Sequence, residues 1–241
     1  MGFNKQYDSL APFYDSVIGK INSSQKFLLD TSKKYLNKNS KVLELGCGTA
    51  ENLLPFSKSY NVSGIDISGE MIKIAKKKIP KGSFFKADIT NFNLDEKFDL
   101  IFCVYDTINH LPDFKSWIKL FKNVRQLLNT NGIFIFDFNT LYKLNILAQS
   151  DIYPEFPGED VLLLNIKKQN KNLFNWEIKY FRNLAKAKYE LINTTIPESA
   201  FENDRIFSEL KKYFTLVNTY NENFKKISKN SFRIFCVAKL K

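Results

Sequence analysis

A glycine-containing stretch, Val42-Leu43-Glu44-Leu45-Gly46-Cys47-Gly48-Thr49-Ala50, is the part of this sequence best suited to hold a ligand. It includes a short apolar run at 41–45 that predicts a buried strand. Glycines at a strand end let the backbone turn tightly and let a ligand approach peptide N–H groups at a helix start. A dinucleotide fingerprint would need a third glycine where Glu51 stands, so NAD and FAD are disfavoured. Glu44 suits instead a ligand that carries a positive or hydroxyl-rich group.

His110, the only histidine in the chain, is the residue best suited to accept a proton near neutral pH. It lies in the segment Tyr105-Asp106-Thr107-Ile108-Asn109-His110-Leu111, directly after an apolar run at 98–105. With an unperturbed pKa of about 6.5, an imidazole can orient or deprotonate an amine or hydroxyl nucleophile. Three roles stay open for His110: direct proton transfer, orientation of a substrate without proton transfer, and a structural role.

The elements that must position these residues alternate between strand and helix over residues 1–140. Strand-like apolar runs occupy 41–45, 61–67, 83–86, 98–105 and 132–138. Helical periodicity occupies 24–36, 50–57, 70–78 and 117–128. Strands that alternate with helices imply right-handed crossovers and a parallel sheet covered by helices. We therefore expect an α/β fold.

The pattern changes after residue 140. Three strand-like runs at 161–167, 173–182 and 186–196 have no long helix between them and predict an antiparallel excursion. Alternation from 173 to 181 places Trp176 on one face with three further apolar residues, so this layer either buries its own apolar side or roofs a substrate pocket. A helix at 198–213 and strands at 216–223 and 231–240 would complete the same domain. We thus expect one domain in three parts, 1–140 with an N-terminal helical cap, 141–196 and 197–241.

The composition is that of an ordinary globular protein, with 44% hydrophobic and 25% charged residues among 241. Three cysteines without a CxxC pair cannot make a disulfide framework or a zinc site, which favours a reducing compartment. No apolar run approaches the ~18 residues of a membrane span. The net charge of +11 invites a nucleic-acid partner, but the excess is spread evenly along the chain rather than gathered in a stripe. We expect a cytoplasmic monomer or homodimer without membrane contact, and nucleic acid is disfavoured as a partner.

The glycine stretch resembles motif I of class I S-adenosylmethionine-dependent methyltransferases, written (E/D)-x-G-x-G-x-G. Glu44, Gly46 and Gly48 match this motif, and Ala50 stands at its last glycine. The resemblance covers residues 7–145 well and the remainder only in layout. It implies a Rossmann-like fold, a mostly parallel seven-stranded sheet flanked by helices, with a small antiparallel β insertion after the fifth strand. The string from Asp106 to Leu111 is similar to that of an uncharacterised branch of this family.

The resemblance also implies roles for individual residues around S-adenosylmethionine. Asp66 would accept hydrogen bonds from the ribose hydroxyls, Asp88 would take the adenine amino group, and Ile89 would stack on the ring. The implied cofactor-binding residues are Tyr14, Glu44, Gly46, Cys47, Gly48, Asp66, Ile67, Met71, Asp88, Ile89 and Tyr105. The opening Tyr7-Asp8-Ser9-Leu10-Ala11-Pro12-Phe13-Tyr14-Asp15 is similar to the Y-D-x-x-A-x-x-Y-D start of many small-molecule methyltransferases, where a short helix closes over the cofactor.

We expect from these features a methyltransferase that acts on nitrogen or oxygen of a small molecule, with no catalytic metal. The loop that carries His110 faces the sulfonium methyl in the class I fold, which implies His110 as the catalytic residue. The expected substrate contacts are Tyr7, Asp106, Asn109, Tyr142 and Trp176. The motifs typical of DNA and protein-arginine methyltransferases are absent after the fourth strand. Two alternatives stay open: an RNA acceptor, and a protein that binds the cofactor without turnover.

Overall fold

Seven strands form the central sheet of the computed structural model, which describes residues 7–18, 22–184 and 188–241. The strand order is β10-β11-β5-β4-β1-β2-β3. Strands β1 to β5 pair in parallel, whereas β11 runs antiparallel to both β5 and β10. Their bounds are β1 Lys41–Leu45, β2 Asn61–Asp66, β3 Ser83–Lys86, β4 Phe98–Cys103, β5 Leu128–Asn139, β10 Phe214–Asn221 and β11 Arg233–Leu240. The predicted mostly parallel, seven-stranded sheet is confirmed.

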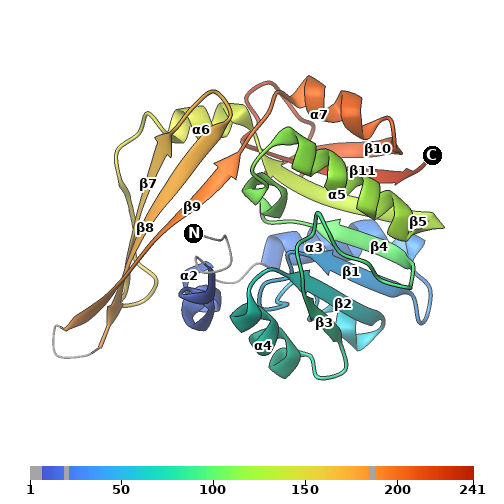
Figure 1. Cartoon of the computed structure of the whole chain (residues 1–241), viewed down its shortest axis with the longest axis horizontal. Helices are drawn as coiled ribbons and strands as arrows, with labels where there is room; N and C mark the ends of the chain where they lie inside the picture. The colour runs from blue at the N-terminus through green and yellow to red at the C-terminus, as the bar shows by residue number, and fades with distance from the viewer. Residues whose placement is uncertain (1–6, 19–21, 185–187) are drawn as a thin grey trace.

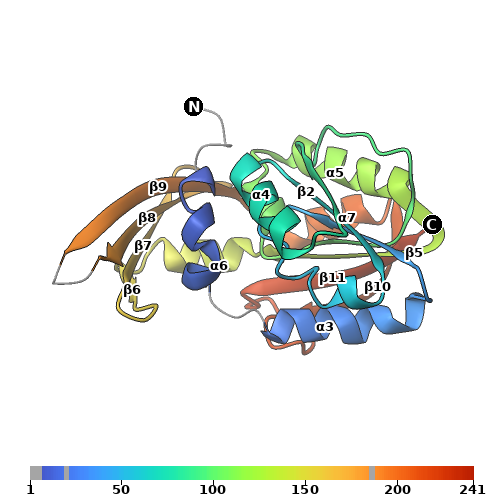
Figure 2. The ribbon, with the colours of Figure 1, turned by 90° about the horizontal axis from the view of Figure 1, so that it is seen from below.

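Helices cover both faces of this sheet, and two separate apolar cores result. On one face α5 and α7 pack with the side chains of one core, and on the other α3, η3 and α4 pack with those of the second. Figure 2 shows α3 and α5 on opposite sides of the strands. The helices between and after the strands of this sheet are α3 Asn22–Ser32, η2 Lys33–Tyr35, η3 Phe56–Lys58, α4 Gly69–Lys78, η4 Thr107–His110, α5 Phe114–Leu127 and α7 Asn203–Leu210. The helices in the described part of the chain are too short or too polar to span a bilayer.

A second, four-stranded antiparallel sheet follows β5 and lies beside the N-terminal segment (Figure 1). Its strands are β6 Tyr153–Glu155, β7 Val161–Lys168, β8 Leu173–Asn183 and β9 Tyr189–Ser199, and α6 Leu141–Leu147 leads into it. The N-terminal segment holds η1 Ala11–Phe13 and α2 Tyr14–Ile18. The antiparallel insertion is thereby confirmed, while residues 186 and 187 of its predicted third strand lie outside the described residues. The sequence patterns did not predict α6 and β6.

The helix predicted at 50–57 is wrong, because this segment forms turns that end in the short helix η3. Ala50 has a φ of +64°, which breaks the right-handed helical path at its start. Pro55 has no N–H to donate to the carbonyl of Glu51, and the side-chain amide of Gln25 donates to that carbonyl instead, at 2.8 Å. Single helical bonds survive on either side, such as Leu54 N–H to the carbonyl of Ala50 at 3.1 Å.

The start of the helix predicted at 198–213 is also wrong. Residues 198 and 199 still belong to β9, where Glu198 pairs with Phe174 and Ser199 pairs with Leu173 of β8. The helix α7 begins only at Asn203. Pairing with a strand distant in sequence has thus overridden the local helical pattern.

Candidate active site

A cavity of about 550 Å³ lies where three parts of the chain meet. These parts are the carboxyl ends of the parallel strands, the N-terminal segment and one face of the small sheet. Open α/β sheets bind their ligands at this edge. The predicted site residues that line the cavity are Tyr7, Tyr14, Gly46, Gly48, Asp66, Ile67, Met71, Asp88, Ile89, Tyr105, Asp106, His110 and Trp176.

Asp66, at the end of β2, is hydrogen-bonded to the glycine loop. Its carboxylate accepts the N–H of Gly48 and the N–H of Ser68, each at 2.8 Å. Burial raises the pKa of Asp66, although these two N–H groups act in the opposite direction. Gly46 has no room for a side chain, because an added Cβ would lie 2.2 Å from Cγ2 of Thr107. The glycine loop therefore fits tightly against the segment that carries His110.

Glu44 and Cys47 line a smaller hollow of about 30 Å³ that shares Gly46 and Gly48 with the main cavity. One carboxylate oxygen of Glu44 accepts a hydrogen bond from Asn52 at 3.0 Å, and the other has no partner among the described residues. Burial raises the pKa of Glu44, since a buried carboxylate with an unsatisfied oxygen is costly. A ligand with a positively charged group would satisfy that oxygen. The ammonium of S-adenosylmethionine fits this requirement.

The two aspartates of the N-terminal motif fasten this segment to the large sheet. Asp8 accepts a hydrogen bond from the hydroxyl of Ser68, the residue that caps α4, at 2.5 Å. Asp15 accepts one from Thr49 at 2.5 Å and pairs with Lys78 at 2.7 Å. The motif's tyrosines, Tyr7 and Tyr14, both line the cavity. Its alternation of tyrosine and aspartate thus separates residues that face a ligand from residues that hold the segment in place.

His110 presents an unprotonated ring nitrogen to the cavity. Its Nδ1 lies 3.3 Å from the carbonyl oxygen of Pro197, which can only accept, so Nδ1 carries the proton. Its Nε2 lies 2.9 Å from the hydroxyl of Tyr7, which donates to the Nε2 lone pair. Burial lowers the pKa of His110 below the usual 6.5, although Asp106 opposes this shift. His110 is therefore neutral at neutral pH and able to accept a proton at Nε2.

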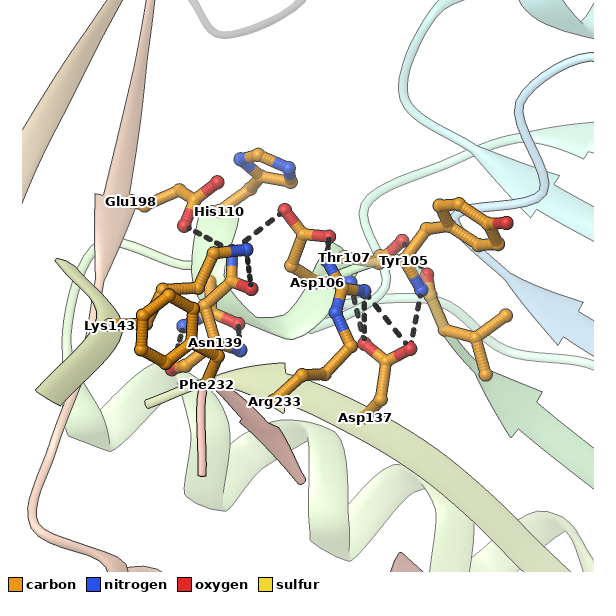
Figure 3. Close-up of polar contacts among 12 residues, drawn as sticks. Tyr105, Asp106, Thr107, His110, Asp137, Asn139, Lys143, Glu198, Phe232 and Arg233 are labelled. Carbon is orange, nitrogen blue, oxygen red and sulfur yellow. Dashed lines mark hydrogen bonds and ion pairs between the residues drawn. The ribbon is translucent and has the colours of Figure 1, made fainter. Parts of the chain in front are cut away.

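Tyr105 and Asp106 adopt left-handed backbone conformations, with φ of +60° and +52°. Such conformations cost roughly 1–3 kcal/mol per non-glycine residue and cluster at functional sites. The carboxylate of Asp137 accepts the N–H groups of both residues, at 3.0 and 2.6 Å. Arg233 donates to Asp137 at 3.1 Å and to Asp106 at 2.5 Å (Figure 3). Burial opposes the charge on Asp106, but the guanidinium outweighs it and holds the pKa of that carboxyl well below its usual range.

Glu198 joins the site from the small sheet and was missed in the sequence. Its side chain is 3% exposed and lines the cavity. The amide of Asn139 donates to Glu198 and to Asp106, each at 3.0 Å, while Lys143 donates to the oxygen of Asn139 at 2.8 Å (Figure 3). Burial and the neighbouring Asp106 raise the pKa of Glu198. Ile196 and Glu198 are two positions apart, so in an extended strand they lie on the same face. This spacing is the signal in the sequence that could have placed Glu198 beside the cavity.

Two predicted substrate contacts, Asn109 and Tyr142, are not among the residues that line the cavity. Asn109 is fully buried, and its amide donates to the carbonyls of Asn139 and Ser199 at 3.0 and 2.9 Å. It thereby ties the end of β5 to the end of β9. The ring of Tyr142 lies 5.8 Å from that of Phe232, and the residue is 37% exposed.

Asp106, His110 and Glu198 carry ligand-type atoms that lie within 4.8 Å of one another. A divalent cation there would lie beside Arg233, which already occupies Asp106, and beside Lys143. Both positive side chains oppose a doubly charged ion, because they leave at most one of the carboxyl groups of Asp106, Asp137 and Glu198 without a cation beside it. That the site works without a metal stays a prediction.

Comparisons with known proteins agree with this geometry. The family model described as "Methyltransferase domain" matches residues 42–132. A putative methyltransferase from Geobacillus is 25% identical over 97% of this chain and 99% of its own length. The putative methyltransferase YqeM of Bacillus subtilis is 30% identical over 65% of this chain and 69% of its own.

A solved structure extends the agreement to three dimensions. The S-adenosylmethionine-dependent methyltransferase from Clostridium acetobutylicum is 27% identical, with a TM-score of 0.85 over 97% of this chain and 98% of that one. The similarity in fold thus extends over nearly the whole length of both chains. This chain belongs to the class I S-adenosylmethionine-dependent methyltransferases.

Proposed function

We propose that this methyltransferase transfers the methyl group of S-adenosylmethionine to a nitrogen or oxygen of a small-molecule acceptor, with His110 as the base. The observation that carries the proposal is the Nε2 lone pair of a neutral, half-buried imidazole at the wall of the cavity. The cavity volume of about 550 Å³ lies within the roughly 300–1,000 Å³ typical of small-molecule sites.

The cofactor would lie along the edge of the large sheet. Asp66 would accept the ribose hydroxyls, Asp88 and Ile89 would hold the adenine, and Glu44 would receive the ammonium of the methionine part. When bound, S-adenosylmethionine supplies a methyl group on a positively charged sulfur, and this carbon bonds to the acceptor as its bond to sulfur breaks.

The chain's own residues would align the acceptor and remove its proton. Pro197 fixes the tautomer of His110, so that Nε2 is the atom that takes the proton from the acceptor. Tyr105 borders the place of transfer, and the N-terminal tyrosines cover it. Alignment in such a site can supply roughly 7–11 kcal/mol of barrier reduction. A general base adds typically ~10²–10⁴-fold.

A labelling experiment tests this proposal. The purified protein is incubated with a metabolite extract and methyl-labelled S-adenosylmethionine, and products are identified by mass spectrometry. We expect label on a nitrogen or oxygen of a small molecule, with the rate at least tenfold lower for His110→Ala. Calorimetry with Asp66→Ala, expected to lose cofactor binding, checks the cofactor site separately.

The two alternatives make different predictions in the same experiment. Label in the RNA fraction, with a steep salt dependence of RNA affinity, would replace the small-molecule proposal. Cofactor binding without label in any fraction would favour a protein that does not turn over.

A further inference from the structure

The charges that line the cavity are opposite in sign to the charge of the protein. The chain carries 36 Lys and Arg against 25 Asp and Glu, a net charge of +11. Among the described residues that line the cavity there is no Lys or Arg. The acidic residues that line it are Asp66, Asp88, Asp106, Glu155 and Glu198. The cavity therefore selects for positively charged ligands, although the protein surface as a whole favours negatively charged ones.

The acidic residues belong to two different ends of the cavity. Asp66 ends β2, Asp88 follows β3, and both lie at the proposed cofactor site. Asp106 and Glu198 lie with His110 at the other end, where one carboxylate oxygen of each and a ring nitrogen of His110 are within 4.8 Å of one another. The ribose hydroxyls and the adenine amino group of the cofactor account for the first end only. In the proposed arrangement the carboxyl groups of the second end are left for the acceptor.

Nearby cations neutralise this second end only in part. Arg233 pairs with Asp106 and Asp137, and Lys143 donates to the oxygen of Asn139. Among the described residues Glu198 forms no ion pair, although it is 3% exposed. The carboxyl groups of Asp106, Asp137 and Glu198 thus face two cations, and Glu198 is the one that forms no ion pair with either, although Lys143 acts on its charge. Ionisation of a buried carboxyl of this kind is costly unless a cation binds to it.

The wall beside Glu198 is apolar. Ile196 precedes Glu198 by two positions on β9, and Trp176 lies opposite Ile196 on β8, so all three share one face of the small sheet. This face also contributes Ile178, Leu162 and Leu164 to the cavity. A ligand that fills this end presents an apolar body to the sheet and a charged group to Glu198.

We propose that the acceptor is an amine with an apolar body, bound with its ammonium against Glu198 and its body against the β7–β9 face. This inference rests on the proposed function and narrows it from nitrogen or oxygen to nitrogen. Acceptors that place a phosphate or carboxylate at this end are excluded, because the negative charges of Asp106 and Glu198 repel them.

The protons balance in this reaction. The bound ammonium gives one proton to Nε2 of His110, and the freed lone pair forms the new nitrogen–carbon bond as the carbon–sulfur bond breaks. The electron pair of that bond stays on sulfur. The product leaves as a methylated ammonium, and His110 releases its proton to solvent. Each turnover therefore releases one proton.

Matched probes test the inference. Straight-chain and arylalkyl primary amines, each with the alcohol and the carboxylate of the same length, are titrated by calorimetry into the protein saturated with S-adenosylhomocysteine. We expect the amines to bind at least tenfold more tightly than both counterparts. Glu198→Gln should remove this preference. Glu177→Gln is the control, because Glu177 lies on the same sheet but between two cavity-facing residues, and so points to the opposite face.

The outcomes separate the two proposals. Equal or tighter binding of alcohols or carboxylates, no binding by any amine of the series, or an unchanged preference in Glu198→Gln would overturn the amine inference. Incubation of the same probes with labelled S-adenosylmethionine then reads the function itself. Label on the alcohols would keep the methyltransferase proposal and refute only the amine. Failure of S-adenosylhomocysteine to bind would refute the proposed function before any probe is added.

Discussion

The hydroxyl of Tyr7 lies 2.9 Å from Nε2 of His110, although 103 positions separate the two residues. Burial raises the pKa of Tyr7, so its hydroxyl keeps its proton and donates to the histidine. This hydrogen bond stabilises neutral His110. It also occupies the atom that the acceptor must reach. The acceptor can therefore contact Nε2 only when the Tyr7 hydroxyl has moved away from it.

The first prediction concerns the pKa of His110. Burial and Arg233 lower it, Asp106 raises it, and the Tyr7 hydroxyl favours the neutral ring. We expect Tyr7→Phe to raise the pKa of His110 towards 6.5 by removing a donor to the lone pair. Because the chain has one histidine, proton NMR of the untagged protein follows a single imidazole through the titration. A wild-type pKa above 6.5 would contradict the neutral assignment.

The second prediction concerns the pH dependence of amine binding. Burial and Asp106 raise the pKa of Glu198, whereas Asn139 and Lys143 act in the opposite direction. An ammonium binds the ionised carboxylate, so affinity should rise as the pH increases through this raised pKa and fall below it. Calorimetry at a series of pH values measures this. This rise of amine affinity with pH should be absent in Glu198→Gln. If it persists in that variant, the titration belongs to another group.

A third prediction tests the buried clamp on the left-handed turn. Asp137→Asn keeps the shape but removes the charge that pairs with Arg233 and accepts two backbone N–H groups. Because breaking a buried ion pair leaves its partner unpaired, we expect the free energy of unfolding to fall by about 3–5 kcal/mol. Urea unfolding measures this value. Glu70→Gln, which removes only an exposed pair with Lys73, is the control and should change little.

A fourth prediction concerns the contact between the glycine loop and the segment of His110. Gly46→Ala would place a methyl group 2.2 Å from Cγ2 of Thr107, at a backbone φ of +69°. Overpacking of this kind costs typically about 1–3 kcal/mol. Thr107→Ala removes the colliding atoms, so the double variant should be more stable than the sum of the two single effects predicts. Strict additivity in thermal unfolding would show that the collision is relieved in another way.

The sequence was sufficient for the parts of this molecule that depend on local patterns. Apolar runs that alternate with amphipathic ones predicted the parallel strands and the antiparallel insertion. The cofactor residues follow strand ends, and this spacing brings Gly46, Asp66 and Asp88 to one edge of the sheet. Local chemistry also explains one failure, because Pro55 and the left-handed Ala50 stop the helix that periodicity predicted.

The acceptor end of the cavity could not be predicted from the sequence, because it depends on contacts between residues that are far apart in the chain. Asp106 is held by Arg233, which lies 127 positions away, and Glu198 is linked through Asn139 at a separation of 59. Contacts at such distances leave no periodic pattern in the sequence. Glu198 was assigned to a helix because the amphipathic run after it is strong, whereas pairing with Phe174 keeps it in a strand. Asn109 was expected to touch substrate, and its buried hydrogen bonds give it a supporting position instead.

Besides the N-terminal segment, the walls of the cavity come from two sheets that are hydrogen-bonded separately. The proposed donor site lies on the large sheet, and the apolar wall for the acceptor lies on β7, β8 and β9. Mutations at 161–199 can therefore accumulate without altering the proposed contacts with the methyl donor. We expect descendants of one ancestral chain to keep a common methyl donor while their acceptors diverge, each lineage changing the small sheet alone.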